Sequence, residues 1–216
     1  MSDYQQVIAS LRQSYNHYAA EQRDTFAKTW WKVEDRQHFL DLLQLEGKTD
    51  LLEVGAGTGY DSLFFQQHSL KVTATDLSPD MVEKCREKGL QAYVMDFMNL
   101  GFPAQSFDAI YAIDCLVHVP TRELPAVLEK LHALLRPDGL FFVSVYGGME
   151  KEGITDKDWH NPPRFFSRHT DEYWKTVTAA LFHLVSFKTV EVEKDEPGWH
   201  VQSMVLRRRE PPLKNA

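Results

Sequence analysis

The chain has 216 residues, and its 24 Lys+Arg against 31 Asp+Glu give a formal net charge of −7. This length is typical of one compact domain, and a hydrophobic content of 43% is sufficient for a packed core. The longest basic block is Arg207–Arg209, which is far less positive surface than nucleic acids require. Because no apolar run approaches the ~18 residues of a membrane span, we expect neither a nucleic-acid nor a membrane partner.

The two cysteines, Cys85 and Cys115, are too few for a disulfide framework or a metal cluster. The N-terminus lacks the pattern of a secretory signal. We therefore expect a cytoplasmic protein without a metal, either a monomer or a homodimer.

The five tryptophans are unevenly distributed, because none lies between Leu51 and Tyr146. This distribution indicates that the middle of the chain and its two flanks have different tasks.

The predicted elements begin with two amphipathic helices, over residues 3–20 and 32–46. Strands and helices then alternate, with Ser78 and Thr121 as helix caps and residues 136–139 as a turn. This alternation predicts a parallel sheet with helices on both faces, which binds ligands at the carboxyl ends of its strands. The predicted strands are Asp50–Val54, Lys71–Thr75, Leu90–Met95, Phe107–Ile113 and Leu140–Tyr146.

The tail differs from this pattern. A helix is expected to start at Thr170–Glu172, followed by strands over Leu184–Glu193 and Trp199–Arg207 around the turn Asp195–Gly198. Two strands joined by so short a link are antiparallel, which predicts a hairpin at one edge of the sheet.

A glycine loop, LLEVGAGTGYDS, follows the first predicted strand, with glycines at 55, 57 and 59. Such a loop lets a ligand approach the backbone, although a tight structural turn is the alternative. A dinucleotide fingerprint requires glycine at the sixth position, where this chain has Tyr60. Asp76 follows Gly55 by 76 − 55 = 21 positions, the distance of an acid that binds ribose hydroxyls; a helix cap or a solvated aspartate is the alternative.

Several motifs together resemble the class I S-adenosylmethionine-dependent methyltransferase family, over roughly Asp50 to Tyr146. They are LLEVGAGTG, DLSPDM, YVMDFMNLGFPAQSFDAIYAIDCLVHV and LLRPDGLFFVSVY. The resemblance implies an α/β, doubly wound, Rossmann-like seven-stranded sheet, parallel except for a C-terminal antiparallel hairpin strand. It also implies S-adenosyl-L-methionine as cofactor and S-adenosyl-L-homocysteine as product.

The resemblance assigns parts of the cofactor to particular residues. Glu53 and the glycine loop would line the methionine part, Asp76 would hold the ribose, and Asp96 would hold the adenine amino group. Asp96 could instead cap a turn, and we expect Asp108 to fix the turn into the fourth strand. The predicted cofactor-binding residues are Tyr15, Glu53, Gly55, Ala56, Gly57, Gly59, Asp76, Leu77, Asp96, Phe97, Asp114 and Cys115.

The methyl acceptor needs a base if it loses a proton, and His118 is the candidate because it follows the fourth strand. Alternatively, His118 packs against the sheet. His17, His160 and His169 compete for the role, and no pair of them has metal-site spacing.

The flanks are expected to form the acceptor site. Residues 147–169 are too long for an ordinary connection, which indicates a functional loop, and the N-terminal segment would fold over the cofactor as a lid. The alternative for these aromatic side chains is a small hydrophobic cluster, and Arg164 could hold the acidic stretch Glu150–Asp158 rather than a substrate carboxylate. The predicted substrate-binding residues are Tyr18, Trp31, Tyr146, Trp159, Arg164 and Phe165.

The sequence thus predicts one domain over 1–216, with a helical lid (1–46), a cofactor-binding core (50–146), a substrate-cap loop (147–169) and a helix with a hairpin (170–210). It predicts methyl transfer to an O, N or C atom of a small molecule by in-line displacement. Two alternatives are an NAD(P)-dependent Rossmann oxidoreductase and a non-catalytic protein that retains the S-adenosylmethionine pocket. A protein target also stays open, whereas the acidic surface disfavours RNA.

Overall fold

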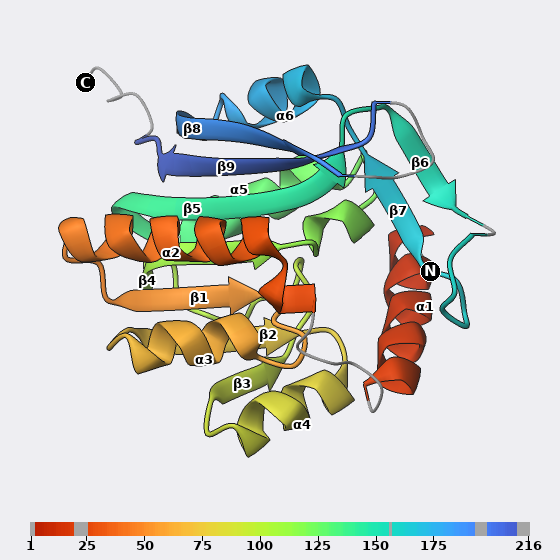
Figure 1. Cartoon of the computed structure of the whole chain (residues 1–216), viewed down its shortest axis with the longest axis horizontal. Helices are drawn as coiled ribbons and strands as arrows, with labels where there is room; N and C mark the ends of the chain where they lie inside the picture. The colour runs from red at the N-terminus through yellow and green to blue at the C-terminus, as the bar shows by residue number, and fades with distance from the viewer. Residues whose placement is uncertain (1–2, 20–25, 156, 193–197, 211–216) are drawn as a thin grey trace.

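The computed structural model describes residues 3–19, 26–155, 157–192 and 198–210, and its helices surround one central sheet (Figure 1). The helices are α1 (Asp3–Tyr18), η1 (Phe26–Lys28), α2 (Trp30–Leu45), α3 (Tyr60–Gln67), α4 (Pro79–Glu87), η2 (Leu116–His118), α5 (Leu124–Leu134) and α6 (Asp171–Thr178). The strands are β1 (Asp50–Val54), β2 (Lys71–Asp76), β3 (Gln91–Val94), β4 (Phe107–Ile113), β5 (Leu135–Gly147), β6 (Lys151–Ile154), β7 (Phe165–Arg168), β8 (Phe182–Glu191) and β9 (His200–Arg208).

The main sheet has seven strands in the order β3-β2-β1-β4-β5-β9-β8. Strands β1 to β5 pair in parallel, and β9 is antiparallel to both β5 and β8. The predicted doubly wound sheet with a C-terminal hairpin is therefore confirmed. Of the predicted hairpin turn, residues 195–197 lie outside the described residues, as does Glu193 at the end of the preceding strand.

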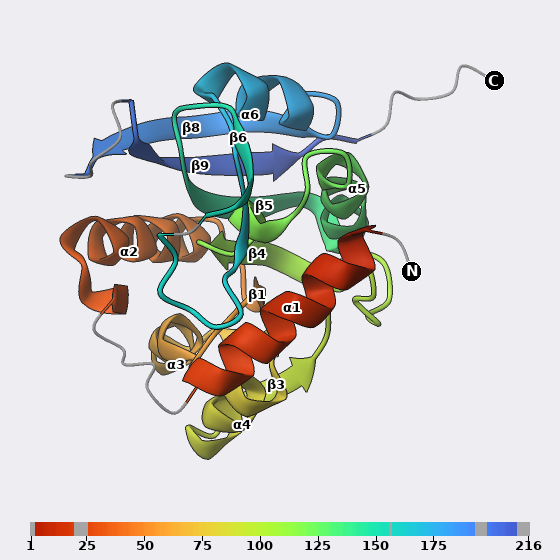
Figure 2. The same ribbon diagram turned by 90° about the vertical axis from the view of Figure 1, so that its right-hand side faces the viewer.

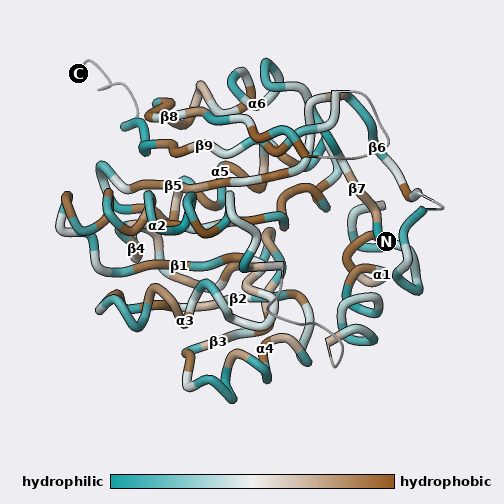
Figure 3. The backbone as a smooth tube through the Cα atoms, in the orientation of Figure 1, coloured by the Kyte–Doolittle hydropathy of each residue, from teal (hydrophilic) through white to brown (hydrophobic). Residues whose placement is uncertain are grey.

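Alternate residues of the central strands enter different cores. Leu51 and Tyr111 face α2 and α3, where Phe39 packs between them and Phe142. The neighbouring residues Leu52 and Ile110 face the core that α5 and α6 cover. Figure 3 shows the hydrophobic colouring concentrated along strands such as β5, while the outer sides of the helices are hydrophilic. Burial on both faces explains why these strands read as apolar runs.

Two local expectations need correction. Thr121 does not cap α5, because that helix begins at Leu124 after Glu123, and the Thr121 hydroxyl donates instead to Glu152. Residues 136–139 fall within the bounds of β5 rather than before it, but the chain does turn there, because the partners change from Phe107–Leu135 to Ala109–Leu140 and Asp138 has a φ of 58°. In contrast, Ser78 caps α4 as predicted and accepts a hydrogen bond from the amide of Met81 at 3.2 Å.

The flanks are also organised differently from the expectation. Residues 147–169 are not only a loop, since β6 and β7 pair as an antiparallel hairpin. Residues 1–46 do not form one lid: α2 packs on the sheet through Phe39, Leu40 and Leu43, because these side chains make an apolar stripe that is buried there. The helix α1 crosses the side of the sheet at which β1 ends, beside the β6–β7 hairpin (Figures 1 and 2).

Asp108 ties the amino-terminal ends of β1 and β4 together, as expected from its position. Its carboxylate accepts hydrogen bonds from the backbone amides of Thr49 at 2.9 Å and Asp50 at 3.0 Å, and from Arg136 at 2.9 Å. Burial raises the pKa of Asp108, but these donors outweigh it and hold the pKa at about 2.

We predict that Asp108→Ala lowers the free energy of unfolding by about 2 kcal/mol, because two backbone amides lose their acceptor. Since the folded-state pKa lies below the unfolded one, this stabilisation is present above pH 4 and is lost as the pH falls toward 2. Urea unfolding at pH 7 and pH 3 measures both effects. Asp41→Ala, on the exposed side of α2, is the control, and equal losses in the two variants would contradict the role of Asp108.

Candidate functional site

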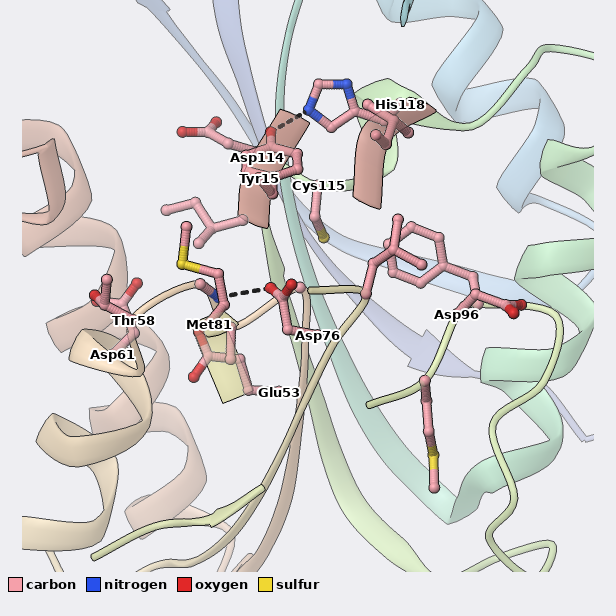
Figure 4. A pocket seen from close by; sticks show the side chains of 18 of the residues that line it. Tyr15, Glu53, Thr58, Asp61, Asp76, Met81, Asp96, Asp114, Cys115 and His118 are labelled. Carbon is pink, nitrogen blue, oxygen red and sulfur yellow. Dashed lines mark hydrogen bonds between the residues drawn. The ribbon is translucent and has the colours of Figure 1, made fainter. Parts of the chain in front are cut away.

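A cavity of about 230 Å³ lies at the carboxyl ends of the parallel strands. Figure 4 shows carboxylates from several strand ends gathered around it. The helix α1 forms one wall, and the glycine loop and the ends of β1, β2 and β4 form the others. The lining residues are Tyr4, Ile8, Leu11, Tyr15, Ala27, Lys32, Glu53, Gly55, Ala56, Gly57, Thr58, Tyr60, Asp61, Asp76, Leu77, Met81, Met95, Asp96, Phe97, Ile113, Asp114, Cys115 and His118.

The glycine loop needs its glycines for two reasons. Gly55, Gly57 and Gly59 all have positive φ, of 69°, 54° and 78°, which other residues adopt only with strain. In addition, a Cβ at residue 55 would overlap Cys115, whereas one at Gly57 would meet no atom within 4 Å. Gly57 therefore leaves open space beside the loop, while its amide donates to Asp76 and its carbonyl accepts from Cys85.

Gly59 has a packing role in the structure and is not among the lining residues. A Cβ at residue 59 would lie 2.6 Å from the Cδ1 atom of Leu90 and 2.8 Å from the Sγ atom of Cys85. This glycine thus lets α4 and β3 approach the start of α3.

Asp76 ends β2 and faces the cavity. It is buried, and its two carboxylate oxygens accept the amides of Gly57 and Ser78, each at 2.8 Å. Burial raises the pKa of Asp76, and these backbone donors oppose the rise. The amide of Leu77 is a third backbone donor, and because a carboxylate has about four lone-pair sites, one site is left to accept a hydroxyl from a ligand.

Asp96, after β3, caps a turn and also lies at the cavity. Its carboxylate caps the following turn by accepting the amides of Met98 at 2.9 Å and Asn99 at 3.1 Å, and it also lines the cavity. Leu77 and Phe97 line the cavity as well and pack against the core.

Glu53 and Asp61 lie in the same wall. Glu53 accepts a hydrogen bond from the hydroxyl of Ser62, and Asp61 forms an ion pair with Arg36 from α2. Burial, followed by the charges of Asp61 and Asp76, raises the pKa of Glu53 well above its usual range.

Asp114 and Cys115 follow β4. Asp114 has a φ of 54°, and its carboxylate forms an ion pair with Lys32, which comes from the first turn of α2. The thiol of Cys115 donates to the carbonyl of Val54 at 3.1 Å, so it holds the end of β1 against the end of β4.

His118 contacts α1 on one side and β7 on the other. Its Nε2 atom lies 2.7 Å from the Tyr15 hydroxyl, and its Nδ1 atom lies 2.7 Å from the carbonyl of Phe165 (Figure 4). Since a carbonyl only accepts, Nδ1 carries the proton, and Nε2 accepts from Tyr15. Burial lowers the pKa of His118 to about 4, which keeps the ring neutral at neutral pH.

Arg164 approaches Tyr15 from the β6–β7 hairpin. Its Nη1 atom donates to the Tyr15 hydroxyl at 3.3 Å, and its Nη2 atom donates to Asp158 at 2.8 Å. Arg164 thus holds Asp158 within the acidic stretch, as one reading of the sequence proposed.

The predicted substrate-binding residues are not among those that line the cavity. Trp31 is buried beside Tyr146, with ring centroids 6.2 Å apart. Tyr18 donates to the carbonyl of Trp159 at 3.1 Å, and the ring of Trp159 is 61% exposed. Phe165 and Arg164 reach the cavity wall only through His118 and Tyr15. These rings form clusters around the cavity in this structure.

The sequence also left some lining residues unnamed. Tyr4, Ile8 and Leu11 precede Tyr15 at intervals of four, three and four residues, and this helical spacing would have identified them as one face of α1. Lys32 and Asp61 gave no local signal, because their partners lie on other elements.

The residues that the structure describes contain neither a candidate membrane span nor a candidate metal site. Among them, no helix is both long and apolar enough to span a membrane. No group of three or more His, Cys, Asp or Glu side chains is arranged to hold a metal ion in that part of the chain.

The chain is similar to known proteins in sequence. Residues 51–139 match the model of a methyltransferase domain. An uncharacterized methyltransferase of Schizosaccharomyces pombe is 25% identical over 73% of this chain and 69% of its own length. The ubiquinone biosynthesis O-methyltransferase of Xylella fastidiosa is 30% identical over 66% of this chain, but the match spans only 63% of that enzyme.

A solved structure has the same fold. It is the 1,6-didemethyltoxoflavin-N1-methyltransferase of Burkholderia thailandensis with bound 1,6-didemethyltoxoflavin and S-adenosylhomocysteine. The match has a TM-score of 0.73 and 23% identity, and it covers 95% of this chain and 90% of that one. Residues 51–139 are therefore a methyltransferase domain, and the relatives and the seven-stranded fold agree with the ordered motifs in supporting a class I S-adenosylmethionine-dependent methyltransferase, an enzyme.

Proposed function

We propose that this enzyme methylates a hydroxyl or amine group of a small molecule, and that Tyr15 and His118 take up the proton that the acceptor loses. The observation that carries this proposal is the 2.7 Å contact between Tyr15 and His118 at the wall of the cavity. The names of the relatives favour small acceptors with such groups, since one is an O-methyltransferase and another an N1-methyltransferase.

The cavity walls fit the methyl donor. Asp76 has a lone-pair site available for a ribose hydroxyl, Gly57 leaves open space beside the loop, and Leu77 and Phe97 offer apolar surface for a base. When bound, S-adenosylmethionine supplies a methyl group on a positively charged sulfur, which an acceptor takes by in-line displacement. Tyr60 at the sixth loop position also lines this cavity, where a dinucleotide would need a glycine.

The chain's own contribution to the reaction is then positioning and proton uptake. Holding two reactants in line is worth on the order of 7–11 kcal/mol in the best intramolecular cases. The helix α1 covers the cavity with Tyr4, Ile8 and Leu11, which excludes water from the reactants.

The proton path follows from the hydrogen bonds. Tyr15 donates its proton to Nε2 of His118 and receives the acceptor's proton on its own oxygen. After both transfers Tyr15 is unchanged and His118 carries one additional proton. The carbonyl of Phe165 keeps the ring in the required tautomer. Arg164 lies 3.3 Å from the Tyr15 oxygen and stabilises negative charge that develops on it.

The ribose role of Asp76 predicts a specific loss of affinity. Asp76→Ala removes the charged acceptor of the ribose, so S-adenosylhomocysteine should bind about thirtyfold more weakly. Titration calorimetry measures this affinity, and circular dichroism checks that the variant stays folded. Asp80→Ala, on the exposed first turn of α4, should bind like the wild type. Unchanged affinity in folded Asp76→Ala would exclude the ribose role.

The proton role of Tyr15 predicts a loss of turnover with little loss of binding. Tyr15→Phe keeps the ring but not the hydroxyl, so methyl transfer should fall by about 10²–10³-fold, while affinity for S-adenosylhomocysteine changes less than about threefold. Transfer of a labelled methyl group to a panel of small amines and alcohols measures the rate. Tyr93→Phe, on β3 outside the cavity, is the control. If Tyr15→Phe methylates every acceptor of the wild type at the wild-type rate, the proposed role of the Tyr15 hydroxyl in proton transfer is wrong.

The pH profile gives a second check on this pair. Because His118 has a pKa of about 4, its Nε2 lone pair is available throughout the neutral range. The rate with saturating donor and acceptor should therefore show no fall near pH 6.5, where an ordinary histidine base would be protonated. A fall centred at pH 6.5 that His118→Gln removes would show that the buried, neutral state is wrong.

A further inference from the structure

Three carboxylates from different elements meet in one wall of the cavity. Glu53 comes from β1, Asp61 from the start of α3 and Asp76 from the end of β2, and all three are buried and line the cavity (Figure 4). Neighbouring carboxylates raise one another's pKa. All three can therefore be ionised only if each has a cation or hydrogen-bond donors that stabilise its negative charge.

The three carboxylates differ in the groups that stabilise their negative charge. Asp61 has the guanidinium of Arg36, and Asp76 has three backbone amides. Glu53 is 1% exposed, and the hydrogen bonds to its carboxylate come from the hydroxyl and the backbone amide of Ser62, which are both neutral donors. Burying an ionised carboxylate without a cation is costly, and such a group keeps its proton instead.

The surrounding groups do not change this balance. The cations on the α2 side are Arg36 and Lys32, which pair with Asp61 and Asp114. Around Glu53 also lie Tyr111 of β4, Cys85 of α4 and Cys115. Burial raises the pKa of each of these three groups, so they are uncharged at neutral pH and add no cation.

We propose that Glu53 is protonated in the ligand-free enzyme and releases its proton when the donor or the product binds. Both ligands carry an α-ammonium group, a cation of the kind that Glu53 lacks among the residues that the structure describes. In this step the carboxylic acid of Glu53 becomes a carboxylate, its proton leaves to solvent, and the ligand keeps all its atoms. The inference rests on the proposed cofactor site and adds that binding is coupled to pH. The raised pKa of Glu53 agrees with it.

The consequence is a measurable proton linkage. At pH values below the pKa of Glu53 in the free enzyme, an increase of one pH unit should strengthen ligand binding by up to about tenfold. The reason is that each ligand that binds releases one proton. Neither the ligand-ribose contact nor the proton path of Tyr15 produces this linkage, since neither removes a proton from the enzyme during binding.

Calorimetry of S-adenosylhomocysteine binding at pH 7, in phosphate and in Tris, tests the proposal. The two buffers have different protonation enthalpies, so the slope of the observed enthalpy against them counts the protons exchanged. We expect the wild type to release between about half a proton and one proton per ligand. Glu53→Gln keeps a partner for Ser62 and should bind with a slope near zero. Asp80→Asn, an exposed carboxylate on α4, should release as many protons as the wild type.

The outcomes are distinguishable. Wild-type binding without proton release would overturn the inference and leave the cofactor site intact, and this result does not depend on whether Glu53→Gln folds. Release that persists in a folded Glu53→Gln variant would also overturn it, because the proton would come from another group. No binding of S-adenosylhomocysteine by the wild type would overturn the proposed function itself.

Discussion

The contact between the glycine loop and the end of β4 is the constraint on which the site depends. Gly55 lies so close to Cys115 that any side chain at residue 55 would overlap it. The thiol of Cys115 donates to the carbonyl of Val54 on the other side of the same contact. Because β1 and β4 are neighbouring parallel strands, this contact brings their carboxyl ends to one level. The loop can then turn away from the sheet and leave a cavity above the ends of β1, β2 and β4.

Electrostatics distinguishes the two ends of this cavity. Around Glu53 and Asp76 the wall is acidic and its polar partners are mostly neutral donors, which suits a cationic ligand. Near Tyr15 the wall has His118 in its neutral form, with Arg164 behind the tyrosine. Tyr15 belongs to α1, and the same helix covers the cavity through Tyr4, Ile8 and Leu11. The cover of the cavity and the Tyr15–His118 pair therefore depend on the same helix.

The uneven tryptophans acquire a structural explanation. Trp31, Trp174 and Trp199 are buried in the flanks, whereas Trp30 and Trp159 are largely exposed. None of the five is among the residues that line the described cavity. The middle of the chain instead covers both faces of its strands with aliphatic side chains and a few phenylalanines. Selection of the methyl acceptor by the aromatic flanks stays a prediction. Arg164 on the β6–β7 hairpin is a side chain that links those flanks to Tyr15.

The features that could be predicted from the sequence are those that depend on residues close together along the chain. Apolar strand runs, the cap at Ser78 and the glycine loop are local patterns, and the regular alternation of strands and helices limits the sheet to few topologies. Strand-end acids such as Asp76 and Asp96 could be located because parallel strands bring their carboxyl ends to one edge.

Which side chains meet across that edge could not be predicted from the sequence and is known from the folded structure. Lys32 with Asp114 and Arg36 with Asp61 join residues from distant parts of the chain, and no local spacing indicates such pairs. The tautomer of His118 likewise follows from a carbonyl of β7 and a hydroxyl of α1, and the charge balance around Glu53 follows from what is buried beside it. These properties depend on distance and burial in the folded molecule, which the order of residues along the chain does not state.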